Sequence, residues 1–109
     1  MTKILIKPLS VNQCWQGKRY KTKTYKSYEK ELLLKLPFKK ISNSKIRIDV
    51  TFGFSNSLSD IDNGLKPFLD ILQKKYNIND RNIYQLNVTK EVVKKGSDFI
   101  LFKIIDITT

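Results

Sequence analysis

The sequence predicts a single α+β domain over residues 1–109, in which helices pack on one face of a mixed sheet in the order β-α-β-α-β-β. Three observations support this. The length of 109 residues is that of one domain with a modest core. The apolar content of 40% is typical of a folded chain rather than a basic low-complexity tail. Segments with apolar residues at every second position alternate with segments at helical spacing.

The first expected element is a strand. In residues 1–7, Ile4 and Ile6 alternate with Lys residues, although the apolar residue between them blurs the pattern. Pro8 ends this strand. Residues 10–17 are rich in Ser, Asn, Gln and Gly, and are therefore expected to form a loop.

The second expected element is a helix over about residues 24–36, capped by Thr22 or Thr24. Its apolar residues form more than one stripe, so it has apolar surface to spare. This surface fits packing on a sheet, on a second subunit, or on both. The residues concerned are Tyr25, Tyr28, Leu32, Leu33, Leu34 and Leu36.

A strand with one buried face is expected over residues 45–55, after a basic loop at 37–44. Apolar side chains occupy every second position of this strand: Ile46, Ile48, Val50, Phe52 and Phe54. The strand leads directly into a stretch that is rich in acidic residues. Those acidic residues are therefore expected at a strand-to-helix corner, held by a rigid element on each side.

A second helix is expected over most of residues 61–76, because apolar residues recur there at helical spacing. Pro67 lies inside this range, and proline interrupts a helix interior. The helix therefore either bends at residues 63–67 or begins late, near Lys66. The apolar stripe consists of Ile61, Leu65, Phe68, Leu69, Leu72 and Tyr76.

The chain is expected to close with a hairpin. A strand begins at Ile83 and runs to about Val93, and the residues of the 94–97 segment, Lys-Lys-Gly-Ser, are typical of a hairpin turn. The returning strand covers residues 98–107. No internal repeat and no linker interrupts this order.

The charge of the chain points to a polyanionic partner. The net charge is +11, and residues 1–40 hold eleven Lys or Arg against two acids, a net of +9. Basic side chains interleaved with aromatic ones are typical of nucleic-acid binding, because they pair with phosphates and stack on bases. The alternative for Trp15, Tyr25 and Tyr28 is a place in the core. The candidate nucleic-acid-binding residues are Trp15, Lys18, Arg19, Lys21, Lys23 and Lys26.

Composition also excludes several classes of protein. The chain has no histidine, which excludes a histidine general base and a histidine zinc site. Its single cysteine, Cys14, excludes an internal disulfide and suits a reducing cytoplasm. No apolar run is long enough to span a bilayer, and the first residues do not form a signal peptide. We therefore expect a cytoplasmic protein with no membrane partner.

The acidic stretch contains the candidate catalytic residues. Asp60 and Asp62 lie two residues apart, Lys66 follows at the next helical turn, and Asp80 comes after the second helix. Carboxylates of this kind bind Mg²⁺ or Mn²⁺, and a lysine beside them stabilises charge on a phosphate. The ordinary alternative is structural. Ser59 with Asp62 resembles a capping box, Asp62 with Lys66 a helical ion pair, and Asp80 a turn residue.

The acidic stretch resembles the RusA family of Holliday-junction resolvases. The resemblance rests on Asp60-x-Asp62-Asn63-x-x-Lys66-Pro67-x-x-Asp70-x-Leu72, then Asn79-Asp80-x-x-Ile83 and Lys90. The segment Pro8-Leu9-Ser10-Val11-Asn12 and the basic stretch that follows also fit, so nearly the whole chain is covered. One departure is Asn79, where family members often carry a second acid.

The resemblance implies a crossover junction endodeoxyribonuclease that cuts four-way DNA junctions in recombination and repair. Asp60, Asp62 and Asp80 would bind Mg²⁺, with Mn²⁺ as an alternative, and Lys66 would assist at the phosphate. Two symmetric cuts imply a two-fold homodimer. The family's usual distribution implies a bacterial or phage origin.

Two other functions fit the sequence. A non-catalytic basic module that binds branched or single-stranded DNA explains the charge and the aromatic residues equally well. It does not explain three acids placed against the anion that it binds. A purely structural protein with a solvated lysine surface is the other possibility, and it predicts no salt-sensitive affinity for DNA.

Overall fold

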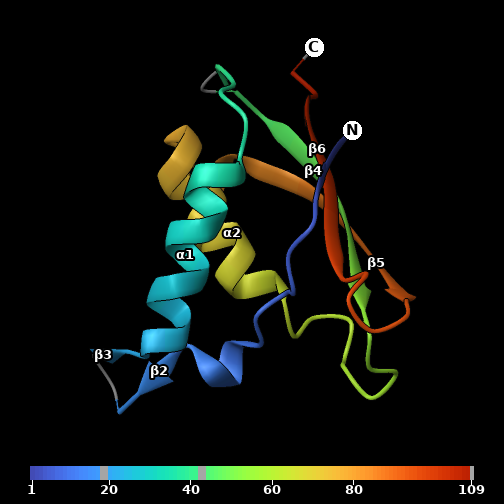
Figure 1. The fold of residues 1–109 in the computed structure, drawn as a ribbon. Coiled ribbons are helices and arrows are strands. Elements are labelled where there is room, and N and C mark those ends of the chain that lie inside the picture. Colours follow the sequence, from blue (N-terminus) through green and yellow to red (C-terminus); the bar gives the residue numbers. More distant parts are fainter. Residues whose placement is uncertain (18–19, 42–43, 109) are drawn as a thin grey trace.

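The computed structural model describes residues 1–17, 20–41 and 44–108 (Figure 1). It confirms an α+β domain with a mixed sheet and two α-helices. The elements in chain order are β1 (Thr2–Ile4), the 3-10 helix η1 (Val11–Gln13), β2 (Trp15–Gln16), β3 (Tyr20–Lys21), α1 (Lys23–Lys35), β4 (Ile46–Phe54), α2 (Leu65–Tyr76), the 3-10 helix η2 (Asp80–Asn82), β5 (Ile83–Val92) and β6 (Phe99–Asp106).

The main sheet has four strands in the order β1-β6-β4-β5. β4 is parallel to β5 and antiparallel to β6, and β6 is antiparallel to β1. The strands β2 and β3 form a separate small hairpin beside the start of α1. Both α-helices lie on one face of the main sheet, as expected (Figure 1).

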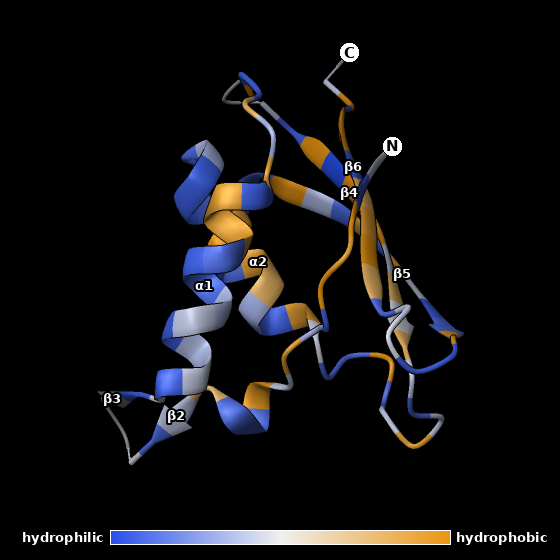
Figure 2. Ribbon diagram, in the orientation of Figure 1, coloured by the Kyte–Doolittle hydropathy of each residue, from blue (hydrophilic) through white to orange (hydrophobic). Residues whose placement is uncertain are grey.

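The core lies between the helices and the inward face of the sheet, where apolar residues gather in Figure 2. Phe68 of α2 is fully buried, with its ring edge-on to Phe52 of β4 at 5.9 Å and to Phe102 of β6 at 5.4 Å. Burying each ring contributes about 1.5–3 kcal/mol, so this cluster fixes α2 against the centre of the sheet. The alternating residues of β4 all point into it, which confirms the pattern read from the sequence.

For the start of each helix the sequence left two alternatives, and the structure confirms one of them in each case. The Thr22 hydroxyl accepts a hydrogen bond from the Tyr25 N–H at 3.1 Å and caps α1. α2 begins late, at Leu65, so Pro67 occupies its third position. The N–H groups of a first helical turn have no partner within the helix, so a proline there breaks no hydrogen bond. The alternative of a helix bent at residues 63–67 is wrong.

The expected closing hairpin is also wrong. A turn is present, since the Ser97 N–H donates to the Lys94 carbonyl at 3.0 Å, but β5 and β6 are not neighbours. β4 lies between them, and the 93–98 segment passes over its end, where the Val93 N–H donates to the Phe54 carbonyl at 2.8 Å. Turn residues indicate that one strand ends and another begins, but they do not show that the two strands pair with each other. β4 has the most completely apolar inward face, and its burial requires a neighbour on each side.

None of the helices formed by the described residues is both long and apolar enough to cross a bilayer.

Candidate active site

Asp60 and Asp62 lie in the segment 55–64, which connects β4 to α2. Both side chains are exposed. Their backbone is ordered by turns, because the Asp60 carbonyl accepts from Asn63 at 3.1 Å and the Asp62 carbonyl accepts from Leu65 at 3.1 Å. These bonds hold two carboxylates, two residues apart, on the outer side of a strand-to-helix corner.

The corner is fastened to the rest of the fold on two sides. The Val11 N–H donates to the Asn63 carbonyl at 2.9 Å, and the Lys90 ammonium donates to the Ser57 carbonyl at 2.9 Å. Gly64 lies so close to Pro8 and Phe52 that an added Cβ would be 3.2 Å and 3.3 Å from them. The corner is therefore a fixed platform for the two carboxylates.

The helical placement of Asp62 was expected but is wrong. α2 begins at Leu65, so both candidate acids precede the helix, and no capping box forms at Ser59. Gly64 occupies the N-cap position without a side-chain hydrogen bond. Lys66 instead pairs with Asp70, one turn on, at 2.8 Å, and its side chain is 68% exposed. Such an exposed pair is worth a few tenths of a kcal/mol, so Lys66 is easily released to another anion.

Asp80 lies far from the corner within one chain. β4 and β5 are parallel, with Ile46 beside Ile83 and Phe54 beside Val92. Asp80 comes just before β5, at the end of the sheet where β4 begins, whereas Asp60 and Asp62 follow the end of β4. The twelve-residue α2 spans the gap and is about 18 Å long. Among the described residues, no three Asp, Glu, Cys or His side chains are grouped so as to hold a metal ion.

The expectation that residues 77–82 fold Asp80 back towards Asp60 and Asp62 is therefore wrong for a single chain. The reason is topological. A helix that connects two parallel strands must return along their whole length, so the residues before and after it lie at opposite ends of the sheet. The acids can share a site only if a second chain supplies one of them.

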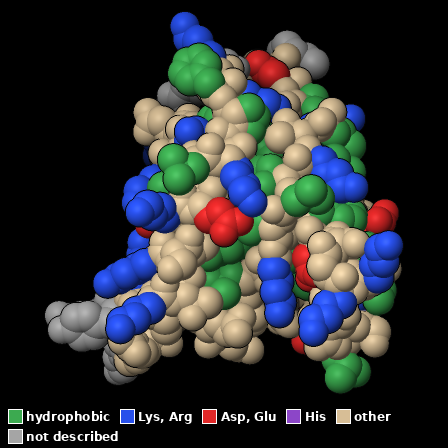
Figure 3. All heavy atoms as spheres, viewed as in Figure 1, with side chains coloured by type: hydrophobic (Ala, Val, Ile, Leu, Met, Phe, Trp, Pro, Cys, Tyr) green, Lys and Arg blue, Asp and Glu red, His purple; other side chains and the backbone are tan. Residues whose placement is uncertain are grey.

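The structure describes four of the six candidate nucleic-acid-binding residues. Lys18 and Arg19 lie outside the described residues, while Lys23 and Lys26 are exposed on the first turn of α1. Trp15 is 46% exposed and lies opposite Lys21 in the β2–β3 hairpin. Figure 3 shows Lys and Arg side chains over much of one face, with few acidic side chains among them.

The alternatives for the aromatic residues are resolved by burial. Tyr25 and Tyr28 are core residues, at 3% and 6% exposure. Burial and, as a smaller cause, the nearby carboxylate of Asp70 raise the pKa of the Tyr25 hydroxyl to about 12, so this tyrosine stays neutral. Trp15 packs edge-on against Tyr25 at 5.9 Å and keeps an exposed part of its indole.

Lys21 can bind a phosphate only by giving up an ion pair that it already forms. Its ammonium pairs with Glu29 at 3.1 Å, and Lys74 of α2 pairs with the same carboxylate at 3.2 Å. Burial works to raise the pKa of Glu29, but the hydrogen bonds and charges of the two lysines outweigh it and lower the pKa. This triad joins the β2–β3 hairpin and α1 to α2.

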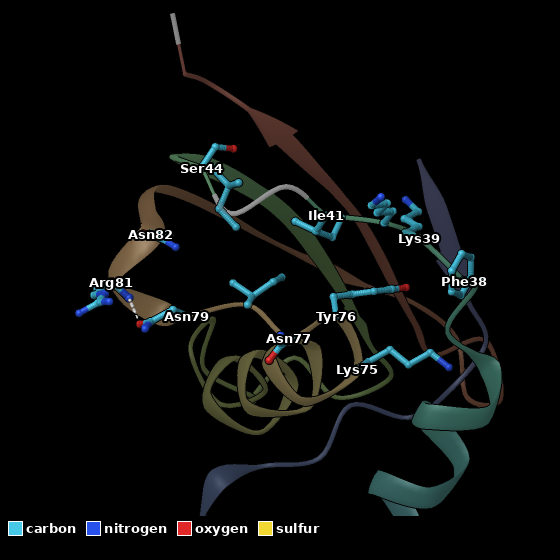
Figure 4. Close-up of a pocket in the computed structure, with 13 residues that line it drawn as sticks. Phe38, Lys39, Ile41, Ser44, Lys75, Tyr76, Asn77, Asn79, Arg81 and Asn82 are labelled. Carbon is cyan, nitrogen blue, oxygen red and sulfur yellow. Dashed lines mark hydrogen bonds between the residues drawn. The ribbon is translucent and has the colours of Figure 1, made fainter.

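A basic pocket at the other end of α2 was not foreseen (Figure 4). Its residues come from positions 38–41, 44 and 46, from the end of α2 and from η2, which are far apart in the sequence. The only signal in the sequence was the run Phe38-Lys39-Lys40, an aromatic residue beside two lysines in a segment read as a basic loop.

Comparisons of the chain with models of known protein families and with curated proteins found no match. The resemblance to the RusA family thus rests on the residues named above.

Proposed function

We propose that the protein is a metal-dependent endonuclease that resolves four-way DNA junctions by paired phosphodiester hydrolysis in recombination and repair. The observation that carries the proposal is the pair of exposed carboxylates, Asp60 and Asp62, on a fastened corner of a chain with a net charge of +11. Two neighbouring carboxylates repel both each other and DNA, and a divalent cation removes both repulsions. The resemblance to RusA-type resolvases agrees with this.

The proposed active form is a two-fold homodimer, since one chain does not bring the third carboxylate to the corner. β5 is an edge of the sheet, with ten residues in one strand. It leaves Tyr84 59% exposed, Leu86 38% and Val92 58%. A long edge strand with exposed apolar side chains is a template for pairing with another strand.

Antiparallel pairing of two β5 strands around a two-fold axis at Val88 fits this edge. Residues whose numbers add up to 176 then lie opposite each other, so Tyr84 meets Val92 of the partner subunit. Aromatic and β-branched residues form favourable cross-strand pairs, and no like charges face each other in this register. The two sheets become one continuous sheet of eight strands.

This arrangement also completes the acidic site. The partner strand runs in the opposite direction, so Asp80 of the partner subunit comes to the end of the sheet that carries Asp60 and Asp62. The hydrogen bond between Lys90 and Ser57 already ties that corner to the C-terminal half of β5. Each dimer therefore has two composite sites, which matches a substrate that needs two symmetric cuts.

The residues of the chain have separate roles in the proposed reaction. A bound Mg²⁺ or Mn²⁺ would supply an acidified water and charge stabilisation. Asp60 and Asp62 would supply carboxylate ligands to this ion, from a backbone that turns hold in place. Lys66, released from its exposed pair with Asp70, would meet a phosphate oxygen. Lys23 and Lys26 would hold the arms of the junction by phosphate contacts.

The test is cleavage of a labelled synthetic four-way junction with Mg²⁺, with Mn²⁺ and with EDTA, beside duplex and single-stranded substrates. Paired, metal-dependent nicks near the branch point are expected. Asp62→Asn should abolish them while keeping or tightening binding, because a charge that repels phosphate is removed. Glu31→Gln, the same change on an exposed carboxylate of α1, is the matched control. A fully active Asp62→Asn protein would contradict the assignment.

A second candidate is a non-catalytic module that binds branched or single-stranded DNA. One observation favours it: Lys23 and Lys26 are exposed at the start of α1, and Trp15 is 46% exposed. This candidate predicts tight, salt-sensitive and metal-independent binding of the junction with no nicks in either metal.

A further inference from the structure

A pocket of about 520 Å³ lies between residues 38–41, 44 and 46 and the end of α2 (Figure 4). It is at the opposite end of α2 from Asp60 and Asp62, and is separate from the candidate nucleic-acid residues around α1. Its volume is within the range of sites that hold small organic groups. The residues of its walls therefore decide which group it can hold.

The floor of the pocket is apolar and fixed. It is formed by Ile41, Ile46, Tyr76 and Ile78, of which Ile46 and Tyr76 are buried. The Tyr76 hydroxyl donates to the Pro37 carbonyl at 2.6 Å and so ties the residue that precedes Phe38 to the last residue of α2. An aromatic edge and three isoleucines form a surface suited to a flat apolar group such as a nucleobase.

The rim of the pocket is cationic. Lys39, Lys40, Lys75 and Arg81 line it, and none of its thirteen lining residues is acidic. Among the described residues, no carboxylate forms an ion pair with any of these four. The Lys75 ammonium donates to the Leu33 carbonyl of α1 at 3.1 Å, a bond that a phosphate would have to replace. In Figure 4 Lys39 and Lys75 lie on one side and Arg81 on the other. Cations on both sides suit an occupant with an anion on both sides.

Exposed polar and aromatic groups complete the rim. Phe38 is 92% exposed beside the two lysines that follow it, where its ring is free to stack on a base. The Asn79 side-chain oxygen accepts from the Arg81 N–H at 3.1 Å. The NH₂ group of Asn79 takes no part in that bond. Amide groups of this kind form hydrogen bonds with base edges.

We propose that this pocket binds one unpaired nucleotide of a nucleic-acid strand, with the base over the apolar floor and the flanking phosphates on Lys75 and Arg81. A strand fits better than a free nucleotide because the cations lie on opposite sides of the floor. The inference rests on the proposed function only in taking the strand to be DNA. In the proposed dimer, the pocket of one subunit lies at the same end of the sheet as Asp60 and Asp62 of the other.

The experiment measures the affinity of a short fluorescent single strand in EDTA, where no cleavage occurs, at fixed salt. The variants are Lys75→Gln with Arg81→Gln, and separately Phe38→Ala. The matched control is Lys94→Gln with Lys95→Gln, which removes the same two charges from the exposed 93–98 segment. We expect the pocket variants to lose about tenfold in affinity, as for a base stack or two phosphate contacts, and the control to lose much less.

Several results would overturn the proposal. One is an equal loss of affinity in the pocket and control variants, since that would show only a general effect of charge. Another is displacement of the strand by inorganic phosphate or a free mononucleotide at equal concentration. Lys40→Gln with Phe38→Ala repeats the test if the first double variant unfolds. Junction cleavage is measured separately. If the parent protein does not cleave the junction but its affinity for the strand depends on the pocket, the proposed nuclease function is contradicted and this inference is not.

Discussion

The backbone N–H of Val11 donates a hydrogen bond to the carbonyl of Asn63, at 2.9 Å. Val11 lies in the N-terminal segment Pro8-Leu9-Ser10-Val11-Asn12, and Asn63 ends the acidic Asp60-x-Asp62-Asn63 stretch. Two stretches that are 52 positions apart in the sequence are thus joined in the fold. The N-terminal segment acts as a brace for the corner that carries both candidate acids.

The first prediction concerns the close packing behind that corner. Gly64→Ala should lower the free energy of unfolding by about 1–2 kcal/mol, because the new Cβ would lie 3.2 Å from Pro8 and 3.3 Å from the Phe52 ring. Both neighbours are buried and have little room to move. Alanine fits the φ of −90° at this position, so the cost comes from packing. Urea denaturation measures it. Ser57→Ala, on the exposed part of the same segment, should have almost no effect.

The second prediction concerns the bond between Lys90 and Ser57. Lys90→Met keeps the length of the side chain but removes the donor to the Ser57 carbonyl. We expect faster amide hydrogen exchange in residues 56–62 and weaker junction cleavage, with a loss of unfolding free energy below about 1.5 kcal/mol. Lys94→Met, four residues along the chain, should change neither exchange nor cleavage. Unchanged exchange in residues 56–62 would show that the corner is held by other contacts.

The third prediction concerns the lysine pair around Glu29. The pKa of this carboxyl is lowered from its ordinary 4.5, so the charged form is the one that the fold stabilises. Its contribution is therefore complete above about pH 4.5 and is lost as the pH falls through the lower pKa of the folded state. Glu29→Gln should be less stable than the parent at pH 7, by about 1 kcal/mol or less, and the difference should be smaller at pH 3.

Denaturation midpoints in urea at the two pH values check this. Glu31→Gln, which breaks an exposed pair within α1, provides the comparison on the same helix. A deficit of Glu29→Gln that stays the same at pH 3 would mean that the side chain acts by packing and not by charge.

The sequence was most informative where local chemistry decides the structure. Thr22 as a helix cap and the alternation of β4 both follow from interactions between near neighbours. Pairing between strands depends on which faces must be covered, and nothing within residues 94–97 reports that β4 enters between β5 and β6. The prediction of a turn at residues 94–97 was therefore correct, and the prediction that the two flanking strands pair was wrong.

The same limit applies to the candidate site. The positions of Asp60 and Asp62 beside each other follow from their spacing and the corner they occupy. The distance to Asp80 follows from the parallel pairing of β4 and β5, which spacing does not reveal. The basic pocket draws on three separate segments, so no window of the sequence contains it.

The fourth prediction concerns the β5 edge. Val88→Cys should form a disulfide-linked dimer under mild oxidation, because residues directly opposite in an antiparallel pair have Cβ atoms about 4.5–5.5 Å apart. The native Cys14 is 1% exposed, and burial raises the pKa of its thiol, so it should stay unreactive. Thr89→Cys is the control, since its equivalent in the partner subunit lies diagonally at about 7–8 Å. A non-reducing gel separates the species, and a parent protein that sediments as a monomer would contradict the dimer.

The last prediction asks whether the acidic site is shared between subunits. Asp62→Asn and Asp80→Asn should each abolish cleavage as homodimers. A mixture that has exchanged subunits contains heterodimers in which one composite site has lost both acids and the other keeps both. With random exchange about half of the dimers are mixed, so about a quarter of the sites should be active, and the products should be single nicks rather than paired cuts. If all three acids acted within one chain, every subunit in the mixture would lack one of them. No activity would then return, and Asp80 would be left as a turn residue at the far end of α2.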